Sequence, residues 1–150
     1  RSERNSAREE LGLAPSDFAL CFVANEFERK GLRSLLAAMR ILFQDHFKCH
    51  LIVAGNDSAA PYQSELTNIE SFVHFLGHRQ DIDRIYAAAD VFVLPTNYDL
   101  SPLVGLEALA AGLLLLMTPI GGIRDYLQEG ATGYFIKPDP ADTPTRSSHS

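Results

Sequence analysis

The sequence has few of the features that anchor metals, disulfides or membranes. Its two cysteines, Cys21 and Cys49, lie in separate apolar runs without redox or metal spacing, and its five histidines show no ligand spacing. No apolar run approaches the roughly 20 residues of a membrane-spanning helix, and the N-terminus shows no signal-peptide pattern. We therefore expect no metal centre and no membrane span, with both thiols buried and reduced in the cytoplasm.

Two nucleotide-binding patterns are also absent. The sequence contains neither G-x-G-x-x-G nor a P-loop, which argues against a dinucleotide-dependent enzyme or a P-loop nucleotidase. Its net charge of −6 argues against nucleic acid or an anionic membrane as the main partner. The length of 150 residues fits one domain. The first residue is Arg rather than Met, so we expect a fragment of a longer protein.

Continuous apolar runs alternate with helical patterns along the chain. Strands are predicted over 18–24, 51–54, 72–76, 90–95, 113–117 and 133–136, and helices over 32–43, 62–69, 81–89, 102–111 and 123–128, with a helical turn over 7–11. Continuous apolar strands indicate a sheet covered on both faces. The alternation predicts a Rossmann-like, doubly wound parallel α/β sheet. We expect a lead-in over 1–14, this domain over 15–139, and a polar, mobile tail over 140–150.

One carboxylate stands alone in the strongly apolar helix predicted over 102–111. Burying Glu107 there without a partner would be costly, so it either meets a partner or faces a cleft. The helix begins just past the carboxyl end of a predicted strand, where open parallel sheets bind ligands. Asp99 lies just before the helix. The two acids fit hydroxyl-rich groups of a ligand; a satisfied structural acid and a solvated loop acid are the alternative.

The start of the same helix has the features of an anion site. Ser101 suits the N-cap and Pro102 the first helical position. The amides of Leu103 and Val104 would then lack intrahelical partners and could donate to a phosphate.

Two other short segments follow predicted strands. Arg29 and Lys30, before Gly31, could clamp a diphosphate, although Glu26 and Glu28 flank them and a solvated basic pair is the alternative. The pair Gly121-Gly122 permits close approach of the backbone to a ligand, and a simple tight loop would explain it nearly as well.

In this order the segments resemble a known family. From about Arg8 to Asp139 the chain is similar to the C-terminal, donor-binding domain of retaining GT-B glycosyltransferases of family 4. The resemblance is carried by REELGL, FALCFVAN, ERKGLRSLLAAM, HLIVAGND, FVHFLGHRQDIDRIYAAADVFVLPT, the D-x7-E pair, EALAAG, TPIGG and GATGYFIKP. The Arg-Lys-Gly segment is most similar to lipopolysaccharide-core glucosyltransferases.

The resemblance implies a reaction and a donor. A hexosyl group would pass from a nucleoside diphosphate sugar, with UDP as the expected nucleotide, to an acceptor hydroxyl with retention, without a metal or separate cofactor. Glu107 would bind the ribose and Asp99 the hydroxyls of the donor sugar. Arg29 and Lys30, with the amides of Leu103 and Val104, would neutralise the diphosphate. The base would lie near Gly77 to Asp81, against His78 or Arg79.

The resemblance also implies what this sequence lacks. The acceptor, a carbohydrate or lipid-linked glycan, would bind a separate N-terminal domain, so we expect the isolated chain to be nearly inert. The missing helices after the last strand would leave an apolar face exposed, with self-association open. The full-length protein would be cytoplasmic, or peripheral to the inner face of the membrane, and would serve surface glycan or lipopolysaccharide synthesis.

Two departures from the family pattern leave other functions open. Asp99 stands where the family usually has Glu, and Pro102, where Gly is common, removes a backbone donor beside the phosphate. A degenerate, non-catalytic nucleotide-binding or interaction module is one alternative. A GT-B-like sugar-nucleotide epimerase is another.

Overall fold

The computed structural model describes residues 2–95, 103–117 and 133–135. These residues form a six-stranded sheet in the order β3-β2-β1-β4-β5-β6, in which all neighbouring strands are parallel. The strands are β1 (Ala19–Val23), β2 (His50–Ala54), β3 (Val73–Gly77), β4 (Val91–Leu94), β5 (Leu114–Met117) and β6 (Gly133–Phe135). This order confirms the predicted doubly wound, Rossmann-like sheet.

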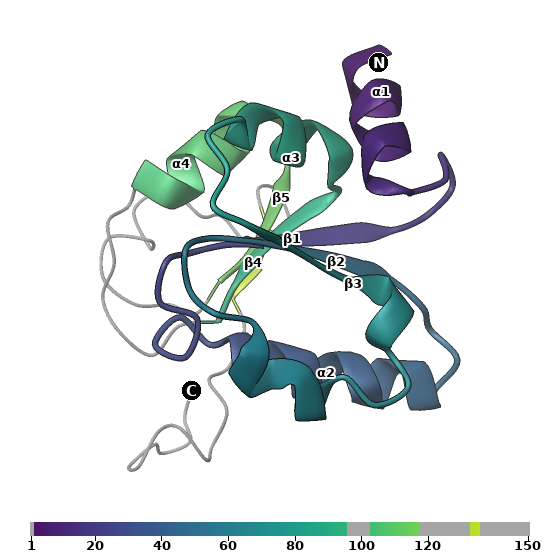
Figure 1. Ribbon diagram of the computed structural model, residues 1–150. Helices are drawn as coiled ribbons and strands as arrows, with labels where there is room; N and C mark the ends of the chain where they lie inside the picture. The colour runs from purple at the N-terminus through teal and green to yellow at the C-terminus, as the bar shows by residue number, and fades with distance from the viewer. Residues whose placement is uncertain (1, 96–102, 118–132, 136–150) are drawn as a thin grey trace.

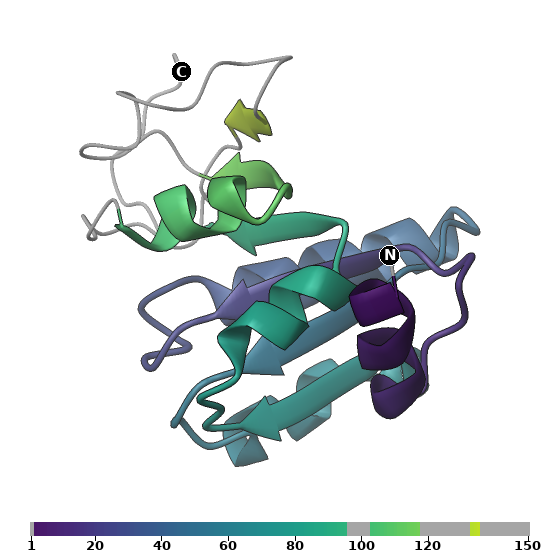
Figure 2. The same cartoon turned by 90° about the horizontal axis from the view of Figure 1, so that it is seen from above.

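Helices cover both faces of the sheet. They are α1 (Ser2–Leu11), α2 (Leu32–Gln44), α3 (Ile82–Ala88) and α4 (Leu103–Ala110), with the 3₁₀ helices η1 (Ala60–Glu65) and η2 (Glu70–Phe72). Figure 1 shows α2 on one face and α1, α3 and α4 on the other, and Figure 2 shows α3 and α4 lying over the sheet. The connections between β1 and β3 lie on one face of the sheet, and the helices α3 and α4 that follow β3 lie on the other. The strand order therefore reverses between β1 and β4, which form the switch point of the sheet.

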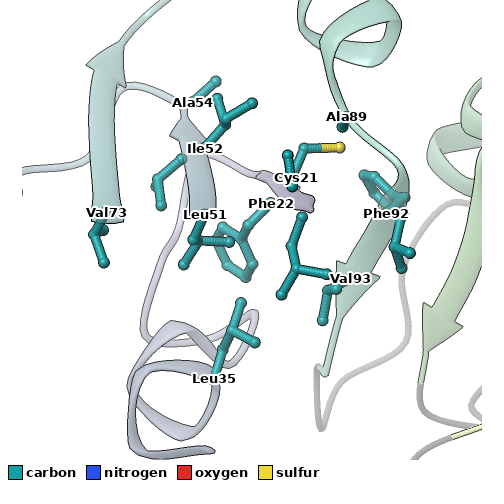
Figure 3. Close-up of a cluster of buried hydrophobic side chains, with 14 of the residues drawn as sticks. Cys21, Phe22, Leu35, Leu51, Ile52, Ala54, Val73, Ala89, Phe92 and Val93 are labelled. Atoms are coloured by element: carbon teal, nitrogen blue, oxygen red, sulfur yellow. The ribbon is translucent and has the colours of Figure 1, made fainter. Parts of the chain in front are cut away.

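The core is formed by the apolar runs that predicted the strands. Figure 3 shows Leu35 of α2 facing Phe22 and Leu51 of the sheet, and Phe22 and Leu51 are fully buried. Each such side chain contributes roughly 1.5–3 kcal/mol through removal from water. Cys21 and Cys49 are buried free thiols, and burial raises the pKa of both, so neither is a reactive thiolate near neutral pH.

Two predicted helices differ in the structure. The helix predicted over 62–69 is wrong: the segment forms only the short 3₁₀ helix η1, and Asn68 has a left-handed φ of 70°. Pro61 in the first turn and the weak helix formers Ser64, Thr67 and Asn68 explain why no α-helix propagates. The turn predicted over 7–11 is the end of the longer helix α1. The helix predicted over 123–128 lies outside the described residues.

A buried arginine fastens α1 to the sheet. Arg8 is 1% exposed. Its guanidinium donates to the carbonyls of Ala88, Ala14 and Asp17 at 3.0, 2.8 and 2.8 Å, and to the Asp90 carboxylate at 3.0 Å. Asp90 also accepts from the backbone N–H of Ala19 at 2.9 Å. Helix α1 is thus tied to the amino-terminal ends of β1 and β4.

Some large apolar side chains stay exposed in the described part of the chain. They are Phe18, Ile41, Leu42, Phe47 and Leu114, between 37% and 59% accessible. The predicted open apolar face of the sheet and the self-association of the chain both stay predictions. None of the described helices is both long and apolar enough to cross a membrane.

Candidate functional site at the carboxyl ends of the strands

The switch point between β1 and β4 brings two of the predicted segments to one end of the sheet. The connection after β1 carries Arg29 and Lys30, and α4 follows β4. Figures 1 and 2 show this connection and the first turn of α4 at the same end of the sheet. A crevice at such a switch point is where doubly wound sheets bind ligands.

Gly31 fixes how closely the Arg29-Lys30 segment approaches β4. Its φ is +95°, and a Cβ placed on it would lie 2.1 Å from the carbonyl oxygen of Pro95. No L-residue fits there without movement of the backbone, because real Cβ atoms essentially never come closer than 3.0 Å to a neighbour. The glycine therefore lets the backbone directly after Arg29 and Lys30 pack against Pro95, the residue that follows β4.

The two cations have different surroundings. Arg29 is exposed, and its Nη1 lies 2.6 Å from Glu26 Oε1 in an ion pair whose side chains are 50% and 57% accessible. Lys30 is half-buried, and its backbone N–H donates to the Glu26 carbonyl at 3.0 Å. The structure thus confirms their place at the carboxyl ends, while their role in binding phosphate stays a prediction.

Residues from the next crossover hold the β1–α2 connection. Asp57 Oδ2 accepts the backbone N–H of Phe27 at 2.9 Å, and Asn25 Oδ1 accepts that of Asn56 at 3.1 Å. Tyr62 of η1 donates its hydroxyl to Glu28 at 2.9 Å. Tyr62 and Asp57 were not predicted to belong to the site. The one sequence feature that could have indicated them is their position after a buried strand.

Glu107 was expected either to meet a buried partner or to face a cleft, and in the structure it faces a cleft. It is exposed on α4 and lines a groove of about 710 Å³ between α3 and α4. The rest of the lining is Glu3, Ile82, Asp83, Tyr86, Ala87, Ala110 and Ala111. Burial raises the pKa of the Tyr86 phenol, and the negative charge of Glu107 acts in the same direction. The groove is therefore lined by apolar side chains and by the three carboxylates of Glu3, Asp83 and Glu107.

The connection from β3 to α3 leads directly into the part of α3 that lines this groove. Its arginine, Arg79, binds both oxygens of Asp81 through Nε and Nη2, at 2.7 and 2.5 Å. This pairing lowers the pKa of the Asp81 carboxyl. Ile82 and Asp83 follow directly and line the groove opposite Glu107. The segment proposed for the base thus directly precedes the part of α3 that lines the groove, and its contact with a base stays a prediction.

Several predicted site residues lie outside the described part of the chain. These are Asp99, Gly121 and Gly122, together with the predicted cap residues Ser101 and Pro102. Helix α4 is described from Leu103 to Ala110, whereas the anion-site prediction placed its first residue at Pro102, and the anion site itself stays a prediction. The helix ends before Gly112, which has a left-handed φ of 90° and is the predicted C-cap. Among the described residues, no group of three or more His, Cys, Asp or Glu is placed to hold a metal ion.

Comparison with known proteins identifies the family. Residues 17–145 match the family described as Glycosyl transferases group 1. The chain belongs to this family. It is 29% identical over 138 residues to the lipopolysaccharide glucosyltransferase WaaG of Escherichia coli (strain K12), covering 90% of this chain and 37% of WaaG. It is 33% identical over 155 residues to a D-inositol 3-phosphate glycosyltransferase of Geodermatophilus obscurus, and the match covers 93% of this chain and 34% of that protein.

Solved structures agree with this assignment. The crystal structure of WaaG, a glycosyltransferase involved in lipopolysaccharide biosynthesis, matches with a TM-score of 0.77 at 29% identity, over 90% of this chain and 37% of WaaG. Anabaena HepE in complex with UDP-glucose matches with a TM-score of 0.78 at 23% identity, over 91% of this chain and 39% of HepE. This match shows the shared fold. This chain spans about a third of the length of these two curated relatives.

Proposed function

We propose that this chain is the donor-binding part of a glycosyltransferase and that it binds a nucleoside diphosphate sugar at the switch point of its sheet. The observation that carries the proposal is the close approach of Gly31 to Pro95, which brings the backbone that carries two adjacent cations to the carboxyl end of β4. Membership of the group 1 family supports the same conclusion.

The diphosphate would lie between the cations and the start of α4. Arg29 offers a planar fork of donors and Lys30 a mobile charge, and the two together match the negative charge of a diphosphate. The backbone amides at the start of α4, at Leu103 and Val104, would add donors, together with the positive end of the helix dipole. In a transferase these groups would stabilise the nucleoside diphosphate as it leaves the sugar, so the proposal requires no metal.

The nucleoside would lie in the groove between α3 and α4. Glu107 would accept hydrogen bonds from the ribose hydroxyls, because a carboxylate is a strong acceptor for them. The base would lie against the β3–α3 connection beside Arg79. On sequence grounds, Asp99 would hold hydroxyls of the donor sugar, and Gly121 and Gly122 would let the backbone approach the ligand closely.

The finer parts of the proposal concern donor, acceptor and location. UDP is the proposed nucleotide, because the HepE structures contain UDP and UDP-glucose. A hexosyl group transferred with retention, in lipopolysaccharide or other surface glycan synthesis, is proposed from the likeness to WaaG. The acceptor would be a carbohydrate or a lipid-linked glycan, bound by a separate domain, and the whole protein would work in the cytoplasm or at the inner membrane face.

Calorimetric titration of this chain with UDP, GDP and ADP tests the proposal. We expect one of them to bind, and Glu107→Ala to weaken binding by about tenfold or more, as expected when a hydrogen-bonding charge is lost. The double variant Arg29→Ala, Lys30→Ala should abolish binding. Glu9→Ala on the exposed side of α1 and Lys48→Ala before β2 are matched charge removals away from the site. Unchanged affinity in the double variant would overturn the proposal.

A further inference from the structure

A buried tyrosine from a different crossover touches the segment that carries the two cations. Tyr62, on η1 after β2, is 3% exposed, and its ring packs edge-on against Phe27 at 6.0 Å between centroids. Its hydroxyl donates to Glu28 Oε1 at 2.9 Å. Burial and the neighbouring Glu28 carboxylate raise the pKa of Tyr62, so the hydroxyl keeps its proton and donates. Residue 28 directly precedes Arg29.

Arg33 of α2 also binds the Glu28 carboxylate. Arg33 Nε lies 3.2 Å from each Glu28 oxygen, and its guanidinium carbon stands 4.8 Å from the centre of the Tyr62 ring. Arg33 Nη1 also donates to Glu65 of η1 at 2.8 Å. Glu28 therefore has partners on two helices, although its side chain is 62% accessible.

The backbone around the cations is held on both sides. On one side Glu28 is fixed by Tyr62 and Arg33; on the other, Gly31 lies against Pro95. Between them, the Gly31 N–H donates to the Glu28 carbonyl at 3.2 Å. Only Arg29 and Lys30 lie between these two fixed points. Holding a binding segment in place before the ligand arrives lowers the entropy cost of binding.

We infer that Tyr62, acting through Glu28, is a positioning residue that sets the Arg29-Lys30 segment for the diphosphate of the donor. The inference rests on the proposed function. Tyr62 does not touch the ligand; its hydroxyl holds Glu28, and Glu28 holds the backbone from which both cations extend. The phenol therefore contributes to phosphate affinity without contributing to recognition of the base.

Tyr62→Phe tests this inference most directly, because it removes one hydroxyl and leaves every charge in place. Loss of one hydrogen bond to a carboxylate should weaken UDP binding by about three- to tenfold. In a Lys30→Ala background the same substitution should change UDP affinity by a clearly smaller factor, since only one of the two cations that it positions, Arg29, is left. Uridine, which has no phosphate, should bind Tyr62→Phe and the unmodified chain equally in an NMR shift titration.

A control variant separates positioning from general loss of structure. Arg40 donates to the carbonyl and carboxylate of Glu65, at the far end of the same cluster of side chains. Arg40→Gln should lower the thermal midpoint of unfolding while leaving UDP affinity unchanged. If Arg40→Gln weakens UDP binding as much as Tyr62→Phe does, the effect is structural and the inference is wrong.

The remaining outcomes separate this inference from the proposed function. If the unmodified chain binds UDP and Tyr62→Phe binds it equally well, the positioning role is refuted while the donor site stands. If the full Tyr62→Phe effect persists in the Lys30→Ala background, Tyr62 acts by another route and the inference is again refuted. If the folded chain binds neither UDP, GDP nor ADP, the proposed function fails and the inference fails with it.

Discussion

Replacing Gly31 with alanine tests the contact on which the candidate site depends. Alanine at a left-handed φ costs about 1–2 kcal/mol. Here the new Cβ would also lie 2.1 Å from the Pro95 carbonyl oxygen, so the backbone must shift by about an ångström. Overpacking of this kind costs about 1–3 kcal/mol. We therefore expect Gly31→Ala to destabilise the chain by about 2–5 kcal/mol in total.

Gly12→Ala is the matched control for this substitution. Gly12 has a similar φ of +80°, but a Cβ on it would meet nothing within 4 Å. It should cost only the conformational part, about 1–2 kcal/mol. Urea unfolding followed by circular dichroism gives both free energies of unfolding, provided that the m-values agree. Equal destabilisation by the two substitutions would refute the argument that Gly31 is needed for the contact with Pro95.

Three further predictions concern single side chains. Arg8→Met should lower the free energy of unfolding by about 1–3 kcal/mol, because the carbonyls bonded to Arg8 lose a donor, whereas Asp90 keeps the Ala19 N–H. Urea unfolding measures this, and no measurable loss would contradict it. Burial lowers the pKa of His50 and His74, whose ring nitrogens lie 3.0 Å apart. Their contribution to stability is therefore complete above the unfolded-state pKa of about 6.5 and is lost as the pH falls through the lower folded values. His74→Gln should flatten urea midpoints measured between pH 7.5 and pH 5, and an unchanged slope would count against this pair. Glu26→Gln should tighten UDP binding by up to about fivefold, because an exposed ion pair that competes for Arg29 is worth less than about 1 kcal/mol; weaker binding in calorimetry would show that Glu26 instead helps the site.

The fold was predictable because its strongest signals are local. The continuous apolar runs gave all six described strands to within one or two residues, and the spacing of Leu32, Leu35, Leu36 and Met39 gave α2. The 3₁₀ segment at Tyr62 was missed, because its apolar spacing resembles a helix while its short polar residues do not support one. The burial of Arg8 was missed as well, since its partners come from distant parts of the sequence.

The candidate site was predictable in its residue types and not in its geometry. Arg29, Lys30 and Glu107 stood out because charged residues follow or interrupt apolar segments. The contact of Gly31 with Pro95 depends on the pairing of β1 with β4, which no local pattern encodes. The role inferred for Tyr62 depends in the same way on a contact between two different crossovers.

The order of the strands also determines when the site can exist during folding. Strands β1, β2 and β3 are consecutive in the chain and adjacent in the sheet, so their pairings join segments closer in sequence than β1 and β4. Pairing of β1 with β4 closes a much longer loop and comes at a higher entropy cost. Only that step brings Gly31 against Pro95. A nucleotide that binds there would therefore bind only after β4 has joined the sheet. A folding intermediate with only the first three strands would contain both cations but no complete site. A ligand added during refolding would act only after β4 has docked.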